Sequence, residues 1–183
     1  MKSYVNDSIQ MLKKASFRRL NNALKVYGSY YQSKWSGRPK QKGLPMAIAI
    51  EPTTACNLGC PECPSGLKQF TRETGNLSIS LNKKIIDELK GKLTYINYYF
   101  QGEPYINPSF LEMVKYASDR KIYTATSTNA HFLNDENARK TVESGLDRII
   151  ISIDGTTQEV YESYRINGDL SKVIEGTRNI IKW

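Results

Sequence analysis

All three cysteines of this 183-residue chain lie in one short stretch, where Cys56, Cys60 and Cys63 are separated by three and then two residues. Disulfide pairing would leave one cysteine over, and the loops between them are too tight to close. The thiolates can instead bind a metal, since zinc sites and iron–sulfur clusters both use cysteine ligands. The stretch therefore predicts a metal-binding loop, and any fold for this chain has to accommodate it.

Two kinds of metal centre are open at this point. A structural zinc ion needs four closed ligands, so the fourth would have to be His131 or a distant carboxylate. A four-iron cluster tolerates three thiolates when its remaining iron takes a ligand from elsewhere. Three buried thiols acting only as small apolar side chains are disfavoured, because glycine, proline and glutamate surround them in a loop.

The rest of the chain alternates between strand and helix patterns. Apolar and β-branched runs predict strands at residues 46–51, 95–100, 121–127 and 148–153. Helical patterns follow at residues 81–90, from 107 onward, and at 134–144, 158–164 and 170–183. Four strand–helix repeats imply parallel strands with right-handed crossovers, an α/β fold. We also expect Asn107 to cap its helix, Asp169 to cap the last one, and the strand at 148–153 to be covered on both faces.

Polar residues gather where these strands end, which is the edge at which parallel sheets carry their chemistry. The first strand leads into the cysteines. The later strands and the turns after them deliver, in chain order, Gly102, Glu103, Asn129, Ser152, Asp154 and Arg165. A carboxylate there suits a ligand ammonium group, and a guanidinium suits a ligand carboxylate. Taken singly, each of these residues could equally be an ordinary turn or surface residue.

Taken together, these motifs resemble those of the radical S-adenosylmethionine (radical SAM) enzymes. The CxxxCxxC loop after an apolar strand, the Gly-Glu-Pro at residues 102–104 and the Ser-x-Asp-Gly at residues 152–155 occur in the order of that family. The resemblance covers roughly residues 46–183 and is closest to the SPASM-type branch. It implies a partial (β/α) barrel with parallel strands, of which this chain holds about four of six βα units.

The resemblance also implies a site and a reaction. Cys56, Cys60 and Cys63 would hold a 4Fe–4S cluster. The contacts to SAM would come from Gly102, Glu103, Asn129, Ser152, Asp154 and Arg165. In this family the reduced cluster cleaves SAM to methionine and a 5′-deoxyadenosyl radical, which abstracts hydrogen from a substrate. The electron donor would be a protein such as flavodoxin or ferredoxin, and the substrate is unknown, with a peptide, a sugar and a lipid precursor all compatible.

The chain departs from the family pattern in a few places. Gln101 replaces a glycine before Gly102, and Ala130 stands where the family often has glycine. Pro61 follows the second cysteine in place of an aromatic residue that backs the adenine. Stacking would then come from elsewhere, with Phe70 and Tyr99 as candidates. His131, the only histidine, could act in acid–base chemistry, although a lone loop histidine is more often solvated or bonded locally.

The N-terminal segment has a different character from the rest. Residues 1–45 carry ten basic residues and one acidic residue, a net charge of +9 within a total of +8, so the remainder carries −1. Apolar residues recur there at helical spacing, which predicts a basic amphipathic helix followed by a linker at residues 34–45. The helix could pack its apolar stripe on the domain or make a peripheral contact with an anionic membrane. No recognition motif accompanies the charge, so we expect no nucleic-acid partner.

We therefore expect a helical extension at residues 1–45 and a radical SAM core at residues 46–183. The core would be incomplete after its fourth unit, because residues 155–183 read as helix and turn, which leaves the edge of the fourth strand open. Clustered cysteines and the lack of a signal-peptide pattern favour a cytoplasmic location. An inactive fragment, or a non-catalytic module that binds zinc or an iron–sulfur cluster, is the alternative to an enzyme.

Overall fold

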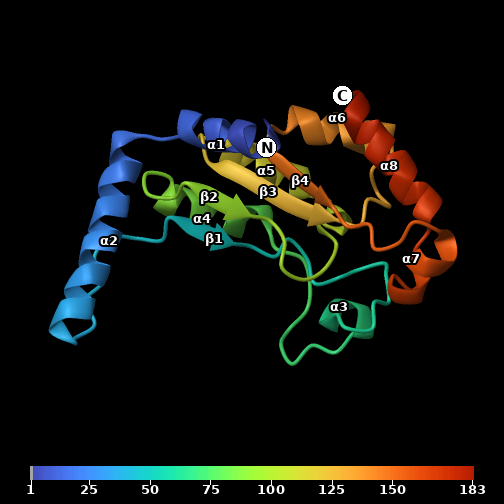
Figure 1. Cartoon of the computed structure of the whole chain (residues 1–183), viewed down its shortest axis with the longest axis horizontal. Coiled ribbons are helices and arrows are strands. Elements are labelled where there is room, and N and C mark those ends of the chain that lie inside the picture. The colour runs from blue at the N-terminus through green and yellow to red at the C-terminus, as the bar shows by residue number, and fades with distance from the viewer. Residues whose placement is uncertain (1) are drawn as a thin grey trace.

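The computed structural model describes residues 2–183, and a parallel four-stranded sheet lies at its centre (Figure 1). The strands follow the chain in the order β1 (Ala47–Ala49), β2 (Tyr95–Asn97), β3 (Tyr123–Thr128) and β4 (Arg148–Ile151). Each strand pairs in parallel with the next one, for instance Ile96 opposite Thr124. All four strands therefore end at the same edge of the sheet, as the alternating sequence pattern predicted.

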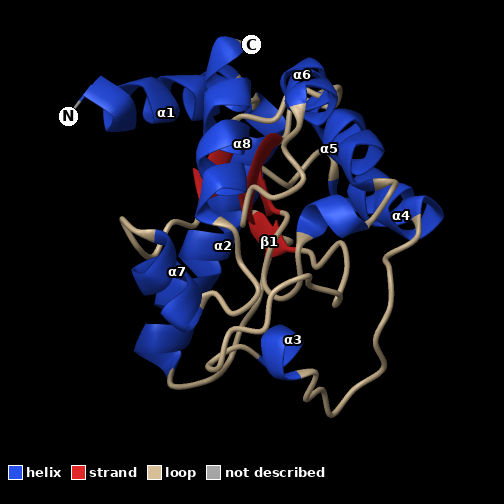
Figure 2. Ribbon diagram, turned by 90° about the vertical axis from the view of Figure 1, so that its right-hand side faces the viewer, coloured by secondary structure: helices blue, strands red, loops and turns tan. Residues whose placement is uncertain are grey.

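The helices that follow the first strand are α3 (Pro64–Leu67), α4 (Ile79–Leu89), the 3₁₀ turn η1 (Pro104–Ile106), α5 (Phe110–Ser118), α6 (Asp135–Glu143), α7 (Gln158–Tyr164) and α8 (Leu170–Lys182). Helices α4 to α8 lie near the ranges that the sequence predicted, whereas α3 and η1 were not predicted. Helices α4, α5, α6 and α8 pack one against the next as a layer beside the sheet (Figure 2). None of the helices within residues 2–183 is long and apolar enough to cross a membrane.

The core lies between the sheet and this helical layer. Ile86 of α4, Ile96 of β2 and Met113 of α5 are fully buried there, with Tyr98 and Phe110 packed edge to face. Full burial of an aliphatic or aromatic side chain of this size stabilises a fold by about 1.5–3 kcal/mol. This core holds the strands in register and so positions the loops at their carboxyl ends.

Two local expectations from the sequence are wrong. Asn107 is not the cap of α5, which begins after Ser109. The Asn107 side chain donates instead to the backbone carbonyls of Pro52 and Leu77, so it ties the cysteine-bearing loop to the turn before α4. The strand β4 is not covered on both faces. Its residues are exposed or half-buried, and it is an edge strand that pairs only with β3 within the described part of the chain.

The N-terminal segment forms two helices, α1 (Lys2–Lys13) and α2 (Phe17–Ser36), rather than one. Ser16, in the break between the two helices, is the N-cap of α2, and Gly37 is its C-cap in a left-handed conformation. Lys14 forms an ion pair with Asp147 that fixes the junction to the core. Of the two arrangements considered for the apolar stripe, packing onto the domain is wrong, because its leucines and tyrosines are exposed on α2.

Candidate active site

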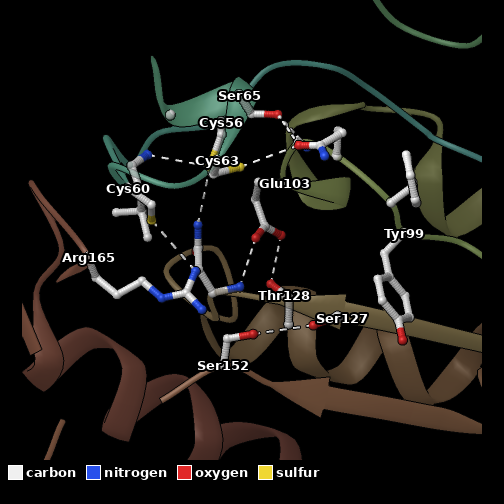
Figure 3. Close-up of a pocket in the computed structure, with 16 residues that line it drawn as sticks. Cys56, Cys60, Cys63, Ser65, Tyr99, Glu103, Ser127, Thr128, Ser152 and Arg165 are labelled. Atoms are coloured by element: carbon white, nitrogen blue, oxygen red, sulfur yellow. Dashed lines mark hydrogen bonds between the residues drawn. The ribbon is translucent and has the colours of Figure 1, made fainter. Parts of the chain in front are cut away.

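The three cysteines line one cavity at the carboxyl edge of the sheet, with a volume of about 160 Å³ (Figure 3). The loop between β1 and α3 carries them. Cys60 is buried, and Cys56 and Cys63 are half-buried. Burial raises the pKa of Cys56, and the hydrogen bond from the Leu58 backbone N–H opposes that shift only in part. A thiol with a raised pKa favours its neutral form until a positively charged partner is supplied, which a metal centre does.

Gly102 allows the second strand's loop to approach this cysteine loop. Its φ is +76°, and a Cβ atom at this position would lie 2.1 Å from the carbonyl oxygen of Thr53. The next residue, Glu103, donates its backbone N–H to the carbonyl of Ala55 at 2.8 Å. The sequence assigned Gly102 a close approach to a ligand. The structure shows that the glycine is needed first for the close approach of two protein loops.

Glu103 reaches the floor of the cavity as a buried carboxylate, with 2% of the residue exposed. Its oxygens accept hydrogen bonds from the Thr128 hydroxyl at 2.7 Å and the Asn129 backbone N–H at 2.8 Å (Figure 3). The Tyr105 backbone N–H donates to the same carboxylate at 3.3 Å. Burial raises the pKa of Glu103, and these donors, together with the charge of Arg165, oppose the shift. Among the ion pairs that the side chains of residues 7–183 form, none includes Glu103. The carboxylate is held by neutral donors and faces a cavity.

Asn129 joins the third strand to the cysteine loop. Its side-chain nitrogen donates to the Asn57 side chain at 2.8 Å and lies 4.0 Å from the Cys56 sulfur. Its backbone N–H binds Glu103, as described above. Asn129 therefore contacts both the predicted metal loop and the predicted ammonium acceptor.

His131 supports this arrangement from behind and does not line the cavity. Its Nε2 accepts the backbone N–H of Asp169 at the start of α8, at 2.9 Å. The proton is therefore on Nδ1, which lies 3.0 Å from the Asn129 carbonyl oxygen and donates to it. The geometry makes His131 a neutral link between the β3 loop and α8, so the acid–base role considered for it has no support here.

We expect this link to weaken in mild acid. Burial lowers the pKa of His131, whereas in an unfolded chain it titrates at about 6.5. The unfolded state thus takes up the proton first, so the stability from His131 is complete above about pH 6.5 and is lost as the pH falls through the lower folded-state value. The melting temperature of the wild type should fall across this window, and that of His131→Gln should fall less.

Because His131 is the only histidine, its imidazole NMR signal reports the folded-state pKa without ambiguity. A value at or above that of a model peptide would contradict the prediction. The difference between wild type and His131→Gln isolates this group, since Glu103, whose pKa is raised, contributes to stability with the opposite dependence on pH.

Arg165 brings a positive charge to the cavity wall. One of its terminal nitrogens donates to the Cys60 sulfur at 3.7 Å, and its Nε pairs with Asp154 at 2.5 Å. Asp154 itself does not line the cavity, so within this structure it positions Arg165. Ser152 does line the cavity, beside Ser127, with the two hydroxyls 3.3 Å apart. The structure thus brings all the predicted site residues except Asp154 to one cavity.

The two aromatic residues considered for stacking on the adenine, Tyr99 and Phe70, line different cavities. Tyr99 lines the thiol cavity, whereas Phe70 lies on the other side of the cysteine loop and stacks on the Arg72 guanidinium. Of the two candidates, Tyr99 is therefore the one placed to contact a ligand beside the thiols, and Phe100 lines the same cavity.

Sequence reasoning assigned no site role to three residues that organise the cavity, Ser65, Gln101 and Thr128. The Ser65 hydroxyl accepts the Gly102 backbone N–H at 2.8 Å and donates to the Gln101 side chain at 3.3 Å, and the same Gln101 oxygen accepts from the Cys63 thiol. Thr128 holds Glu103. The alternation of Thr124, Thr126 and Thr128 along β3 was a readable signal for polar groups in a buried strand, whereas nothing in the sequence indicated that Ser65 meets Gly102.

The donor set of this cavity fits an iron–sulfur cluster. Within the described residues, no three histidine, cysteine or carboxylate side chains converge as ligands of a single metal ion. A four-iron cluster gives each thiolate its own iron, so it requires three sulfurs around one cavity rather than three at one point. Cys56, Cys60 and Cys63 meet that requirement, and the buried carboxylate of Glu103 lies beside them for a positively charged ligand.

Comparison with known families agrees with this geometry. The family model described as the radical SAM superfamily matches residues 50–182, from the end of the first strand to the last helix. The chain belongs to the radical SAM superfamily. The match includes the cysteine loop and every other residue of the cavity, so the family predicted from the motifs is confirmed.

Several curated proteins are similar to most of the length of this radical SAM chain. The mycofactocin maturase MftC of Mycobacterium ulcerans is 33% identical over 136 residues, which cover 74% of this chain and 36% of that protein. The AdoMet-dependent heme synthase of Methanosarcina barkeri is 31% identical, over 66% of this chain and 34% of that protein. The PqqA peptide cyclase of Bradyrhizobium diazoefficiens is 32% identical, over 63% and 30%. The chain thus spans about a third of the length of these relatives.

Solved structures of radical SAM enzymes share the fold. The structure of anSMEcpe with bound AdoMet superposes with a TM-score of 0.63 at 19% identity, covering 75% of this chain and 41% of that one. Streptococcus suis SuiB bound to S-adenosylmethionine gives 0.58 at 16% identity, covering 84% and 35%. The predicted α/β architecture is confirmed, as a partial barrel of four parallel strands and not a closed one.

Proposed function

We propose that this chain binds a 4Fe–4S cluster through Cys56, Cys60 and Cys63, and binds SAM beside it, as part of a radical SAM enzyme. The observation that carries the proposal is the carboxylate of Glu103. It is buried, it forms no ion pair with the side chains of residues 7–183, and it faces the cavity that the three thiols line. A buried carboxylate without a counter-ion is unfavourable, and the ammonium group of SAM would supply one.

The residues around the cavity have distinct roles in this proposal. Thr128 and Asn129 hold Glu103 so that its remaining lone pairs point to an incoming ammonium group. Arg165, oriented by Asp154, offers its guanidinium to the ligand carboxylate. Gly102 and Ser152 form the walls, and Tyr99, with Phe100 beside it, offers an aromatic face for an adenine ring. When bound, the reduced cluster and SAM together supply a 5′-deoxyadenosyl radical for hydrogen abstraction.

The partners of the reaction follow from the family and its relatives. We place the chain in the SPASM-type branch, because the relatives named above include a maturase and a peptide cyclase. The substrate class they favour is a peptide, and SuiB has been solved with a precursor peptide; a sugar or lipid precursor is the alternative. A small electron-transfer protein, such as flavodoxin or ferredoxin, would reduce the cluster in the cytoplasm.

The test is reductive cleavage of SAM. Anaerobically reconstituted chain, given dithionite and SAM, should release 5′-deoxyadenosine and methionine, and the same sample without reductant should release neither. Cluster binding with no product would support the alternative of an inactive fragment. Tight binding of zinc with no uptake of iron would support a non-catalytic metal module and contradict the proposal.

A further inference from the structure

Helix α2 is oriented with its polar side inward and its apolar side outward. The residues it buries are Arg19, Asn22 and Ser29. At 100° per residue, the opposite side of the helix carries a stripe of large apolar side chains, each more than half exposed. This stripe, called the outer face of α2 below, consists of Phe17, Leu20, Leu24, Tyr27, Tyr31 and Trp35. An ordinary surface helix has the reverse arrangement.

Buried hydrogen bonds fix this orientation. The Arg19 guanidinium donates to the carbonyls of Lys121 at 2.7 Å, Arg120 at 3.0 Å and Lys90 at 3.2 Å, all at the turns that precede β2 and β3. Asn22 exchanges two hydrogen bonds with the backbone of Leu44, at 2.8 and 2.9 Å. Rolling the helix to bury its apolar stripe would break these bonds and leave buried carbonyls unpaired, so the outer face is held toward solvent.

Positive charge surrounds the outer face. Residues 8–50 contain nine lysines and arginines and not one acidic residue. Seven of the nine are exposed, and none of these seven takes part in an ion pair within residues 2–183. They are Lys13, Arg18, Lys25, Lys34, Arg38, Lys40 and Lys42.

We propose that the outer face of α2 docks on an anionic lipid surface. Large apolar and aromatic side chains on one face, with lysine and arginine beside them, are the features of helices that lie in the plane of a membrane interface. Tryptophan and tyrosine prefer that interface, and each basic residue near it adds electrostatic attraction to anionic lipids. The charge is complementary to such a surface. A second copy of this chain would bring the same uncompensated positive charge, and nucleic acid would leave the apolar stripe without a partner.

The docked orientation leaves the active site accessible. Helix α2 lies at the end of the sheet where the strands begin (Figure 1), where Arg19 anchors it. The thiol cavity is at the opposite end, where the strands finish. A chain bound through α2 therefore holds its cavity away from the lipid. The substrate and the electron donor would approach from the aqueous side, and the lipid would act as an anchor.

Flotation of the full chain with vesicles tests the docking. Vesicles of phosphatidylcholine with phosphatidylserine should carry the chain, pure phosphatidylcholine should carry much less, and high salt should release it. The double variant Lys25→Gln/Lys34→Gln should bind about thirtyfold more weakly, from about 1 kcal/mol for each charge. The matched control, Lys84→Gln/Lys172→Gln, removes two exposed charges elsewhere and should bind as the wild type does.

A second readout follows the apolar face itself. Trp35 and Trp183 are the only tryptophans, so Trp183→Phe leaves Trp35 as the sole fluorophore. Its emission should shift to the blue with anionic vesicles and be quenched by brominated lipid. Leu24→Ser, at an exposed position, should weaken binding without lowering the melting temperature. Binding that neither α2 variant alters would overturn the proposal. So would a dimer in light scattering that Leu24→Ser dissociates while vesicles bind nothing, because the outer face would then join two copies of the chain.

Discussion

Alanine in place of Cys56, Cys60 or Cys63 should each time abolish cluster assembly. Reconstituted wild type is expected to hold about four irons per chain, with one iron lacking a protein thiolate. Three thiolates are already fewer than the four that most such clusters use, so the loss of one leaves two irons without a ligand and the cluster falls apart. Iron and sulfide analysis under anaerobic conditions, together with the visible absorption of the chromophore, measures the outcome.

A matched control separates loss of a ligand from damage to the cavity. Ser127 lines the same cavity, and its hydroxyl hydrogen-bonds to that of Ser152, so Ser127→Ala should retain its iron. The cysteine variants should melt at about the temperature of the wild type without its cluster, because the loop lies outside the main core. A cysteine variant that keeps its full iron content would show that the thiolate in question is not a ligand.

The fold and most of the site could be read from the sequence because each depends on a local pattern. Apolar runs of strand length and helix caps are local features. The structure has strands at these runs, and Asp169 caps α8 as predicted. Once the strands are parallel, topology alone brings Glu103, Asn129 and Ser152 to one edge. The parallel topology was therefore enough to group these three residues with the cysteines, without knowledge of any individual contact.

What the sequence did not give depends on long-range partners. Asn107 has the composition of a helix cap, but its amide meets carbonyls of Pro52 and Leu77, far along the chain. The apolar stripe of α2 suggested that this side of the helix packs on the domain. Instead, Arg19 donates to four backbone carbonyls, and these hydrogen bonds turn the polar side of α2 inward. Asp154 reads as a ligand residue in its motif, and only the fold shows that it holds Arg165.

Glu103→Gln should weaken SAM binding while leaving the cluster in place. The substitution keeps the size of the side chain and removes the charge that an ammonium group would meet. A charge-assisted hydrogen bond contributes about 1.5–3 kcal/mol, so the dissociation constant for SAM should rise about tenfold to a hundredfold. Equilibrium binding to the reconstituted chain measures it, with iron content determined on the same sample.

The new amide also has a structural effect that the experiment has to separate. Thr128 and the Asn129 N–H both donate to the carboxylate of Glu103, and the amide nitrogen of glutamine cannot accept from either, so some loss of stability is expected. Glu51→Gln is the control. Glu51 is also largely buried, at 18% side-chain exposure, but pairs with Arg72 outside the cavity, so its variant should bind SAM normally. If Glu103→Gln is folded, loaded with iron and unchanged in SAM affinity, then Glu103 only supports the turn, and the ammonium group binds elsewhere.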